Sequence, residues 1–302
     1  MNKILLLGAN GQVGWELQRS LAPIAELVVC DRQRADLANT DNLSRLLDEE
    51  KPDFIVNAGA YTAVDKAESD YSTAHKINAE AVDILARYAR RSNAWLVHYS
   101  TDYVFDGNGD QPFDEETEPA PVNAYGRSKL DGETAIRESG CRHLIFRTSW
   151  VFASRGNNFA KTILRLAKER SDLRVIADQH GVPTSAELIA DVTAQILRKL
   201  SSEVDLQKTA SGTYHLVASG ETSWHQYAQF VITEAHNLGC SLQASSERVV
   251  PITTADYPLP AKRPQNSRLA NAKLQRTFGL VLPDWTIHLR RVIQELVEQE
   301  KK

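Results

Sequence analysis

The chain has 302 residues and a formal net charge of −4, so it carries no excess of positive charge of the kind that binds nucleic acid or an anionic membrane. Hydrophobic residues make up 42% and charged residues 25%, which is ordinary for a soluble globular protein of one elaborated domain or two. No apolar run approaches the roughly 20 residues that span a bilayer, and we expect no signal peptide.

The three cysteines, Cys30, Cys141 and Cys240, are widely spaced and odd in number. This pattern is typical of buried thiols in a reducing compartment, and it indicates neither a disulfide framework nor a zinc site. We therefore expect the protein to be cytoplasmic.

The first motif is a glycine turn directly after a short apolar run, Lys3 to Leu7. Gly8, Gly11 and Gly14 follow in G-x-x-G-x-x-G spacing, and an amphipathic helix begins within the turn. Strand, glycine turn and helix in this order let backbone N–H groups approach a pyrophosphate. The sequence therefore predicts a dinucleotide site at the N-terminus of a βα unit.

A second predicted strand ends at Asp31, about twenty residues after the glycine turn. A carboxylate there accepts hydrogen bonds from the adenosine ribose, which favours NAD, whereas the adjacent Arg32 suits a 2′-phosphate. We therefore expect both NADH and NADPH to be usable. Asp36 and Leu37 follow where a third strand would bring a polar side chain near the adenine, although Asp36 fits a loop cap equally well.

The next segments alternate between predicted strands and helices. A helix is expected at 42–50, a strand at 54–57, a long helix at about 72–91 and a strand from Trp95 to Asp102. Small residues at 58–62 would let a cofactor lie close to the backbone. Asn78, within the long helix, is expected either to bind a caged water or to lie on the surface.

Two hydroxyls and an acid, Ser100, Thr101 and Asp102, end that strand at the sheet edge where doubly wound folds bind ligands. A loop over 103–121 leads to a helix that contains Tyr125 and Lys129 and reaches about Glu138. Residues four apart share one helix face, and an ammonium near a phenol lowers the pKa of the phenol. The pair suits proton donation to a carbonyl, whereas a solvated helix face is the alternative reading.

The sequence of the second half of the chain predicts further helices and strands. Helices are expected at 158–168, 186–199, 224–236 and 285–297, strands at 144–147, 173–176 and 212–217, and a frayed tail from Glu298 to Lys302. The Pro-rich segment 251–268 carries Lys262, Arg263 and Arg268, which suits a nucleotide diphosphate. His98, His180, His215 and His225 have no metal-ligand spacing, so structural roles are expected for them.

Several segments together resemble the dTDP-4-dehydrorhamnose reductase family of the extended short-chain dehydrogenase/reductase superfamily. The blocks that carry the resemblance are the glycine turn, Ser100–Phe105, Tyr125–Lys129, Phe146–Val151, Asn157–Lys161, Asp178–Thr184, Tyr214–Gly220 and Arg263–Leu269. The resemblance implies an α/β fold with a Rossmann-type doubly wound parallel sheet that binds NAD(P) in residues 1–151. It implies a smaller α/β substrate-binding domain in residues 152–302, with an approximate boundary that is open to interleaving.

The resemblance also implies roles for individual residues. Tyr125 would be the proton donor, Lys129 would hold the nicotinamide ribose, and Thr101 would bind the sugar carbonyl oxygen. Substrate would further contact Asp102, Trp150 and Arg263. Cofactor contacts are implied for Gly8, Gly11, Gln12, Val13, Asp31, Asp36, Leu37, Ala60, Tyr61, Thr62, Tyr99, Tyr125 and Lys129.

The implied reaction is hydride transfer from NADPH or NADH to C4 of dTDP-4-dehydro-L-rhamnose, giving dTDP-L-rhamnose for cell-envelope polysaccharides such as O antigen and lipopolysaccharide. Sugar 4,6-dehydratases of the superfamily carry an Asp-Glu pair after the strand-end Thr, whereas Asp102-Tyr103 follows Thr101 here. Reduction therefore fits better than dehydration. Some relatives are described as homodimers with Mg²⁺ at acidic side chains, for which Glu16 and Glu187 are the matching positions.

Two alternatives stay open at this point. One is a reductase of another 4-keto nucleotide sugar, which would differ around Trp150 and in the base-binding pocket. The other is a non-catalytic subunit similar to the regulatory subunit of methionine adenosyltransferase. A binding-only protein has no need of Thr101, Tyr125 and Lys129 together, so their presence favours catalysis.

Overall fold

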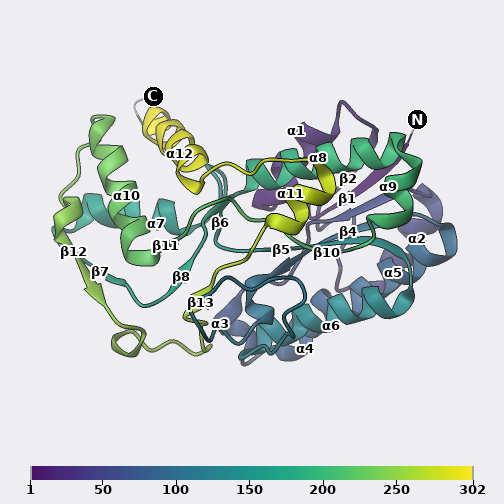
Figure 1. Cartoon of the computed structure of the whole chain (residues 1–302), viewed down its shortest axis with the longest axis horizontal. Helices are drawn as coiled ribbons and strands as arrows, with labels where there is room; N and C mark the ends of the chain where they lie inside the picture. The colour runs from purple at the N-terminus through teal and green to yellow at the C-terminus, as the bar shows by residue number, and fades with distance from the viewer. Residues whose placement is uncertain (1, 301–302) are drawn as a thin grey trace.

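The computed structural model describes residues 2–300 and confirms the predicted fold class (Figure 1). A six-stranded sheet has the order β10-β5-β4-β3-β1-β2, and every neighbouring pair is parallel. The strands are β1 (Lys3–Leu7), β2 (Glu26–Cys30), β3 (Phe54–Asn57), β4 (Trp95–Thr101), β5 (Arg142–Thr148) and β10 (Gly212–His215). The chain runs from β1 out to β2 and then returns to β3 on the other side of β1. This switch point is where parallel sheets of this type bind their ligands.

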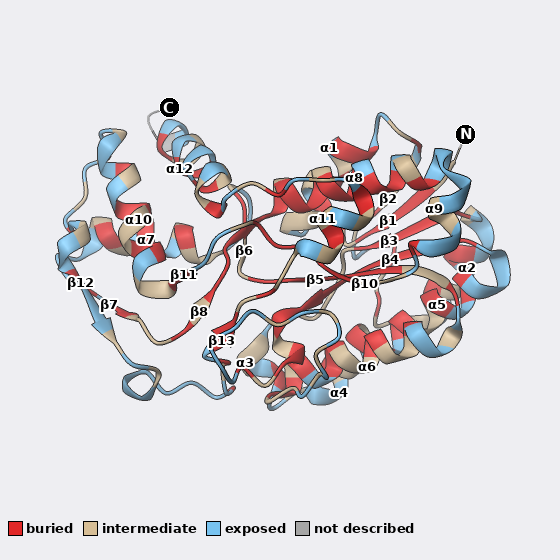
Figure 2. Cartoon of the chain, in the orientation of Figure 1, coloured by how far each residue is buried: buried red, intermediate tan, exposed pale blue. Residues whose placement is uncertain are grey.

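Helices cover both faces of the sheet, and the alternation of side chains along β1 shows why. Ile4 and Leu6 belong to the core that includes α1 (Gln12–Leu21) and α8 (Ala186–Ser202). Leu5 and Leu7 belong to the opposite core, to which α2 (Thr40–Glu50), α5 (Ala81–Ser92) and α6 (Ala124–Ser139) contribute. The inner strands β1 and β3 are buried on both faces, and they are almost continuous apolar runs (Figure 2).

The second half of the chain contributes to both parts of the molecule. Strand β10 extends the six-stranded sheet beside β5, and α8 packs on α1. The division at residue 151 stays a prediction. The smaller part contains α7 (Phe159–Glu169), α10 (Trp224–Asn237), α12 (Trp285–Glu300) and the short strands β6 (Val151–Phe152), β7 (Leu173–Ile176), β8 (His180–Gly181), β9 (Thr184–Ser185), β11 (Thr222–Ser223), β12 (Val249–Ile252) and β13 (Asn266–Ser267). Of the short helices, α3 (Val64–Ala67) follows β3, α9 (Val204–Thr209) lies between α8 and β10, and α11 (Ala272–Phe278) lies between β13 and α12.

The helix predicted at about 72–91 is confirmed in extent, but it contains a π-helical turn. α4 (Tyr71–His75), the π-helical turn η1 (Lys76–Glu80) and α5 follow one another without a break. Asn78 lies in the π-helical turn and is buried, so the surface alternative is wrong. Its Oδ1 accepts the Tyr61 N–H at 2.9 Å, and its Nδ2 donates to the Ser128 hydroxyl at 3.0 Å. Asn78 therefore holds the loop after β3 against α6.

Two further expectations change at the ends of elements. The strand predicted at 212–217 ends at His215, and the helix predicted to end at Val297 continues to Glu300. The predicted frayed tail includes residues 301–302, which lie outside the described residues. Cys30 and Cys141 are buried and Cys240 is half-buried, and all three are free thiols. None of the helices in residues 2–300 has the length and apolar character to cross a membrane.

The glycine turn brings β1, α1 and β3 closer together than any side chain would permit. Gly8 has φ +75°, and a Cβ on it would lie 2.4 Å from the Gly59 nitrogen. A Cβ on Gly14 would lie 2.1 Å from the Gly8 carbonyl oxygen. The turn at the switch point therefore needs glycine at both positions, one for its backbone conformation and one for helix packing.

We predict that Gly14→Ala destabilises the fold by about 1–3 kcal/mol, because the added methyl forces α1 away from the Gly8 carbonyl. Gly212→Ala is the matched control, since the nearest atom to its new Cβ, a ring carbon of Tyr214, lies 3.9 Å away. The control should change the free energy of unfolding by less than about 1 kcal/mol. Urea denaturation of both variants measures the difference, and equal stabilities would contradict this account of Gly14.

Candidate active site

Helix α6 begins at the carboxyl end of the sheet, where three side-chain contacts fix its first turn. The Asn123 side-chain oxygen accepts the Gly126 N–H at 2.8 Å and caps the helix, and its amide nitrogen donates to the Lys262 carbonyl at 2.9 Å. Glu68 accepts the Ala124 N–H at 2.7 Å. Tyr125, in this first turn, is thereby held at the sheet edge by segments from both halves of the chain.

Tyr125, Lys129 and Glu133 lie at four-residue intervals on α6, so they share one helix face. Glu133 is fully buried, and Arg147 of β5 donates to its two oxygens at 2.9 and 2.7 Å. Burial alone would raise the pKa of Glu133, but the hydrogen bonds and charge of Arg147 hold that pKa below its ordinary value. The ion pair therefore anchors this face of α6 to the sheet.

Lys129 is also buried, and the position of its side-chain nitrogen is set by strand β4. Nζ donates to the Tyr99 carbonyl at 2.7 Å and lies 3.0 Å from His98 Nε2. Burial lowers the pKa of Lys129 to about 8, against the opposing effect of Glu133. In this arrangement the Lys129 nitrogen contacts β4, and its effect on the pKa of Tyr125 stays a prediction.

The pKa of Tyr125 is raised, first by burial and then by the charges of Asp102 and Tyr103, whereas a side-chain hydrogen bond with Thr101 opposes the shift. Tyr125 therefore stays a protonated phenol throughout the neutral range, which is the form that a proton donor needs. The Thr101 hydroxyl donates to Asp102 Oδ1 at 2.9 Å. Tyr125, Thr101 and Asp102 thus form one cluster where β4 and α6 meet.

A cavity of about 430 Å³ opens from this cluster over the glycine turn. The predicted cofactor residues that line it are Gly8, Gly11, Gln12, Val13, Asp36, Leu37, Ala60, Thr62, Tyr99, Tyr125 and Lys129. The cavity also includes Arg32, Asn57 and Ser100. Its walls come from the turn after β1, from α1, β3 and β4, and from α6, so it follows the switch point of the sheet, and the residues present fit a dinucleotide.

Asp31 and Tyr61 are the predicted cofactor residues that do not line this cavity. Asp31 Oδ1 instead accepts the N–H groups of Gln33 at 3.0 Å and Arg34 at 3.1 Å, so its carboxylate closes the turn after β2. Asp36 accepts the Ala38 N–H at 3.0 Å, as the loop-cap alternative predicts, and also faces the cavity. The cofactor contacts of all these residues stay predictions.

A second cavity, of about 520 Å³, lies beside the Pro-rich segment and includes Arg263 among its lining residues. The Arg263 guanidinium donates to Asp65 at 2.7 Å and to the Tyr103 hydroxyl at 3.3 Å. The Tyr103 ring meets the Tyr125 ring edge-on, with centroids 5.8 Å apart. Arg263, Tyr103 and Tyr125 therefore connect the second cavity to the first.

Trp150 stands out by its backbone, since its φ of +47° is unusual for a bulky residue and is typical of functional or strained positions. Its ring stacks on Trp224 with centroids 3.6 Å apart. A Cβ on Gly181 would lie 2.7 Å from the same ring. Trp150 lines neither cavity described above, and its contact with substrate stays a prediction.

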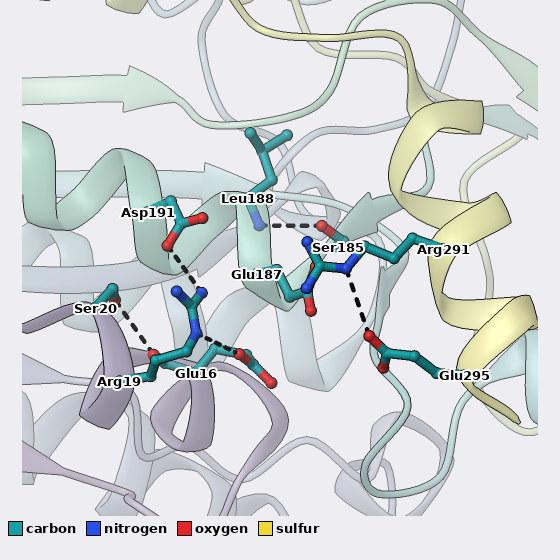
Figure 3. A network of polar contacts seen from close by, with 9 residues as sticks. All are labelled: Glu16, Arg19, Ser20, Ser185, Glu187, Leu188, Asp191, Arg291 and Glu295. Carbon is teal, nitrogen blue, oxygen red and sulfur yellow. Dashed lines mark hydrogen bonds and ion pairs between the residues drawn. The ribbon is translucent and has the colours of Figure 1, made fainter. Parts of the chain in front are cut away.

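The two acids predicted to bind Mg²⁺ lie on neighbouring helices, and each faces an arginine (Figure 3). Arg19 donates to Glu16 at 3.4 Å and to Asp191 at 2.9 Å, and Arg291 lies 3.7 Å from Glu187. The positive charges of these two arginines reduce the repulsion between the acidic side chains. Residues 2–300 contain no group of three or more His, Cys, Asp or Glu side chains arranged to hold a metal.

Sequence reasoning missed His98 and Asn57 as members of the site. His98 is fully buried on β4 and lies between Asn57 and Lys129. The available signal was strand alternation, which places His98 on the same face of β4 as Ser100. Glu133 and Trp224 were also missed, because their partners Arg147 and Trp150 are remote in the sequence.

A parallel sheet with a glycine turn at its switch point and a Tyr–Lys helix at its edge defines an extended short-chain dehydrogenase/reductase, an oxidoreductase. The model of the RmlD substrate binding domain family matches residues 1–298. A dTDP-4-dehydrorhamnose reductase of Escherichia coli K12 is 51% identical over 297 residues, covering 97% of each chain. The chain therefore belongs to the dTDP-4-dehydrorhamnose reductase family.

Other relatives agree. The family's protein from Burkholderia thailandensis is 48% identical over 98% of this chain and 100% of its own. The solved structure of the Bacillus anthracis enzyme in complex with NADP has a TM-score of 0.84 and 32% identity, and it covers 99% of each chain. The chain thus matches these relatives over nearly its whole length.

Asp102 makes the free energy of unfolding depend on pH. Burial raises its pKa from 3.8 to about 6, against opposing hydrogen bonds. An acid whose pKa is higher in the folded state stabilises the fold below about pH 4, and this contribution is lost as the pH rises through about 6. The stability of wild type relative to Asp102→Asn should therefore fall by up to about 3 kcal/mol across that window. Urea denaturation at several pH values measures it, and a constant difference would contradict the raised pKa.

Proposed function

We propose that this protein reduces the C4 keto group of dTDP-4-dehydro-L-rhamnose to the alcohol of dTDP-L-rhamnose, with NADPH or NADH as the hydride source. The observation that carries the proposal is that Tyr125 and Lys129 line the cavity shaped by the glycine turn, with Thr101 hydrogen-bonded to Tyr125. The connection through Tyr103 to Arg263 supports binding of the nucleotide diphosphate in the neighbouring cavity.

The proposed mechanism assigns one task to each of three side chains. The reduced nicotinamide, when bound, supplies the hydride that adds to C4 of the sugar. The Tyr125 phenol donates its proton to the carbonyl oxygen as negative charge develops there, and becomes a phenolate that solvent reprotonates. The Thr101 hydroxyl orients that oxygen, and Lys129 as an ammonium stabilises the phenolate and holds the ribose.

We predict that Tyr125→Phe lowers kcat by roughly 10²–10⁴-fold, the usual contribution of general acid catalysis, while cofactor binding changes little. Loss of nicotinamide absorbance in the presence of the sugar measures turnover, and fluorescence titration measures cofactor binding. Tyr88→Phe, a buried tyrosine on α5, is the matched control and should keep full turnover.

Full turnover in Tyr125→Phe would overturn its assignment as the donor. If the wild type binds cofactor but does not oxidise it with this sugar, a different keto sugar becomes the preferred substrate.

The cavity supports use of NADPH through Arg32. This side chain is 82% exposed, lines the cavity and has Asp36 3.7 Å away, whereas the neighbouring Asp31 carboxylate is engaged with the backbone. An exposed guanidinium on the cavity wall, paired only at 3.7 Å with Asp36, suits a 2′-phosphate.

Arg32→Ala should therefore raise the KM for NADPH about tenfold and change that for NADH less than about twofold, since a charge-assisted hydrogen bond contributes about 1.5–3 kcal/mol. Arg34→Ala is the control, because Arg34 pairs with Glu50 outside the cavity lining. Equal effects of Arg32→Ala on both cofactors would contradict the assignment.

Mg²⁺ binding and a homodimer stay predictions of the family resemblance, and a cytoplasmic location stays a prediction from the cysteine pattern. What supports a cation is the mutual repulsion of acids on this face, since Glu295 and Glu16 both raise the pKa of Glu187 beyond the effect of burial. Arg291 and Arg19 already oppose that repulsion. Sedimentation with Mg²⁺ and with a chelator decides whether assembly depends on the metal.

A further inference from the structure

Lys129 ends a chain of hydrogen bonds that begins at the backbone of the loop after β3. The Gly59 N–H donates to Asn57 Oδ1 at 3.2 Å, which fixes the orientation of the Asn57 amide. The amide nitrogen of Asn57 then faces His98 Nδ1 at 3.2 Å. Because Asn57 Nδ2 carries only donors, His98 Nδ1 must be the acceptor, and the hydrogen of the neutral ring resides on Nε2.

The Nε2–H of His98 points at Lys129 Nζ, 3.0 Å away, and Nζ donates to the Tyr99 carbonyl at 2.7 Å. An ammonium has donors only, so it cannot accept this N–H, whereas a neutral amine has one lone pair that can. If the His98 hydrogen were on Nδ1, two donors would face each other at Asn57 Nδ2. If the Asn57 amide were turned over, its NH₂ group would face the Gly59 N–H instead. Each contact in this series of hydrogen bonds pairs a donor with an acceptor only when Lys129 is neutral.

We propose that His98 is a positioning residue that holds Lys129 as a neutral amine on strand β4, and that Lys129 leaves His98 for the Tyr125 side of the cavity when it takes up a proton from solvent. Lys129 and Tyr125 both line that cavity, so the ammonium has room to move there. The proposal rests on the proposed function only for its catalytic consequence, namely that the ammonium becomes available to Tyr125.

The charged and titratable groups around Lys129 agree with this assignment. From α6, Tyr125 is a protonated phenol and Glu133 is paired with Arg147, so neither offers a free negative charge to the amine. From β4, burial keeps the pKa of His98 well below its ordinary value, so the ring stays neutral. Burial lowers the pKa of Lys129 itself to about 8, so the amine becomes the main form above about pH 8 and the ammonium below it.

The hydrogen bonds from Gly59 to Lys129 do not serve as a proton route. They end at the Asn57 amide and the Gly59 N–H, neither of which titrates near neutral pH. His98 therefore acts through the position and protonation of Lys129, and proton exchange of Tyr125 occurs through the cavity. This distinction separates a positioning residue from a relay.

The first test is ¹⁵N NMR of the full chain with labelled histidine, in which His98→Gln assigns one of the eight histidines. We expect His98 to carry its hydrogen on Nε2 across the neutral range, and its Nε2 shift to move once with a midpoint near pH 8, where Lys129 titrates. The shift should be constant in Lys129→Met. An Nδ1–H tautomer, an imidazolium or a pH-independent Nε2 shift in wild type would overturn the proposal.

The second test is the pH profile of kcat/KM. Activity that needs the ammonium should fall as the pH rises through about 8. In His98→Gln the amide oxygen can accept from the ammonium, so the pH at which kcat/KM falls should rise by about one unit. His143→Gln, near the amino end of β5, is the matched control and should leave that pH unchanged.

If kcat/KM of a folded His98→Gln variant falls at the same pH as that of the wild type, the positioning role of His98 is overturned. If His98→Gln does not fold, the wild-type and Lys129→Met spectra decide alone, with His98 assigned from its Nδ1 contact with labelled Asn57. If the wild type lacks reductase activity, the proposed function fails, while the NMR result still decides the state of His98 and Lys129.

Discussion

The buried ion pair between Glu133 and Arg147 determines where the reactive face of α6 lies. It joins the middle of that helix to strand β5 by two hydrogen bonds of 2.9 and 2.7 Å. Removing one partner of such a pair costs about 3–5 kcal/mol, because an uncompensated charge stays buried. A helix anchored this way cannot rotate freely, so the backbone positions of Lys129 and Tyr125, one and two turns earlier, are fixed at the sheet edge.

The other end of the same face is held by the second half of the chain. Asn123 donates to the Lys262 carbonyl, and Asp65 accepts from both the Arg263 guanidinium and the Ala261 N–H. These contacts bring the Pro-rich segment against the first turn of α6 and the start of α3. Tyr125 of the first cavity is therefore linked through Tyr103 to Arg263 of the second, and the site depends on both halves of the chain.

Much of this arrangement could be predicted from the sequence because the signals are local. The glycine spacing, the buried strands and the small or hydroxyl residues at their carboxyl ends together define the sheet edge, and the structure places Gly8, Thr101 and Tyr125 there. The Asp31 carboxylate shows a limit of the same reasoning. A side-chain acceptor just before a turn is easily captured by the following N–H groups, here those of Gln33 and Arg34.

The features that could not be predicted depend on contacts between remote residues. The orientation of Lys129 follows from His98 and Tyr99 on β4, and the shifted pKa of Tyr125 follows from burial and Asp102. Trp150 stacks on Trp224, which lies more than seventy positions later. Spacing along one helix fixes which side chains share a face, but only the packed structure fixes what that face contacts.

The central claim is that this site transfers hydride to C4 of a keto sugar. The most direct measurement is NMR of the product formed by the purified protein from dTDP-4-dehydro-L-rhamnose and NADPH deuterated at the transferring position of the nicotinamide. The account predicts that the deuterium appears at C4 of the rhamnose product in proportion to the cofactor oxidised. Cofactor oxidation without deuterium at C4, or deuterium at another sugar carbon, would contradict it.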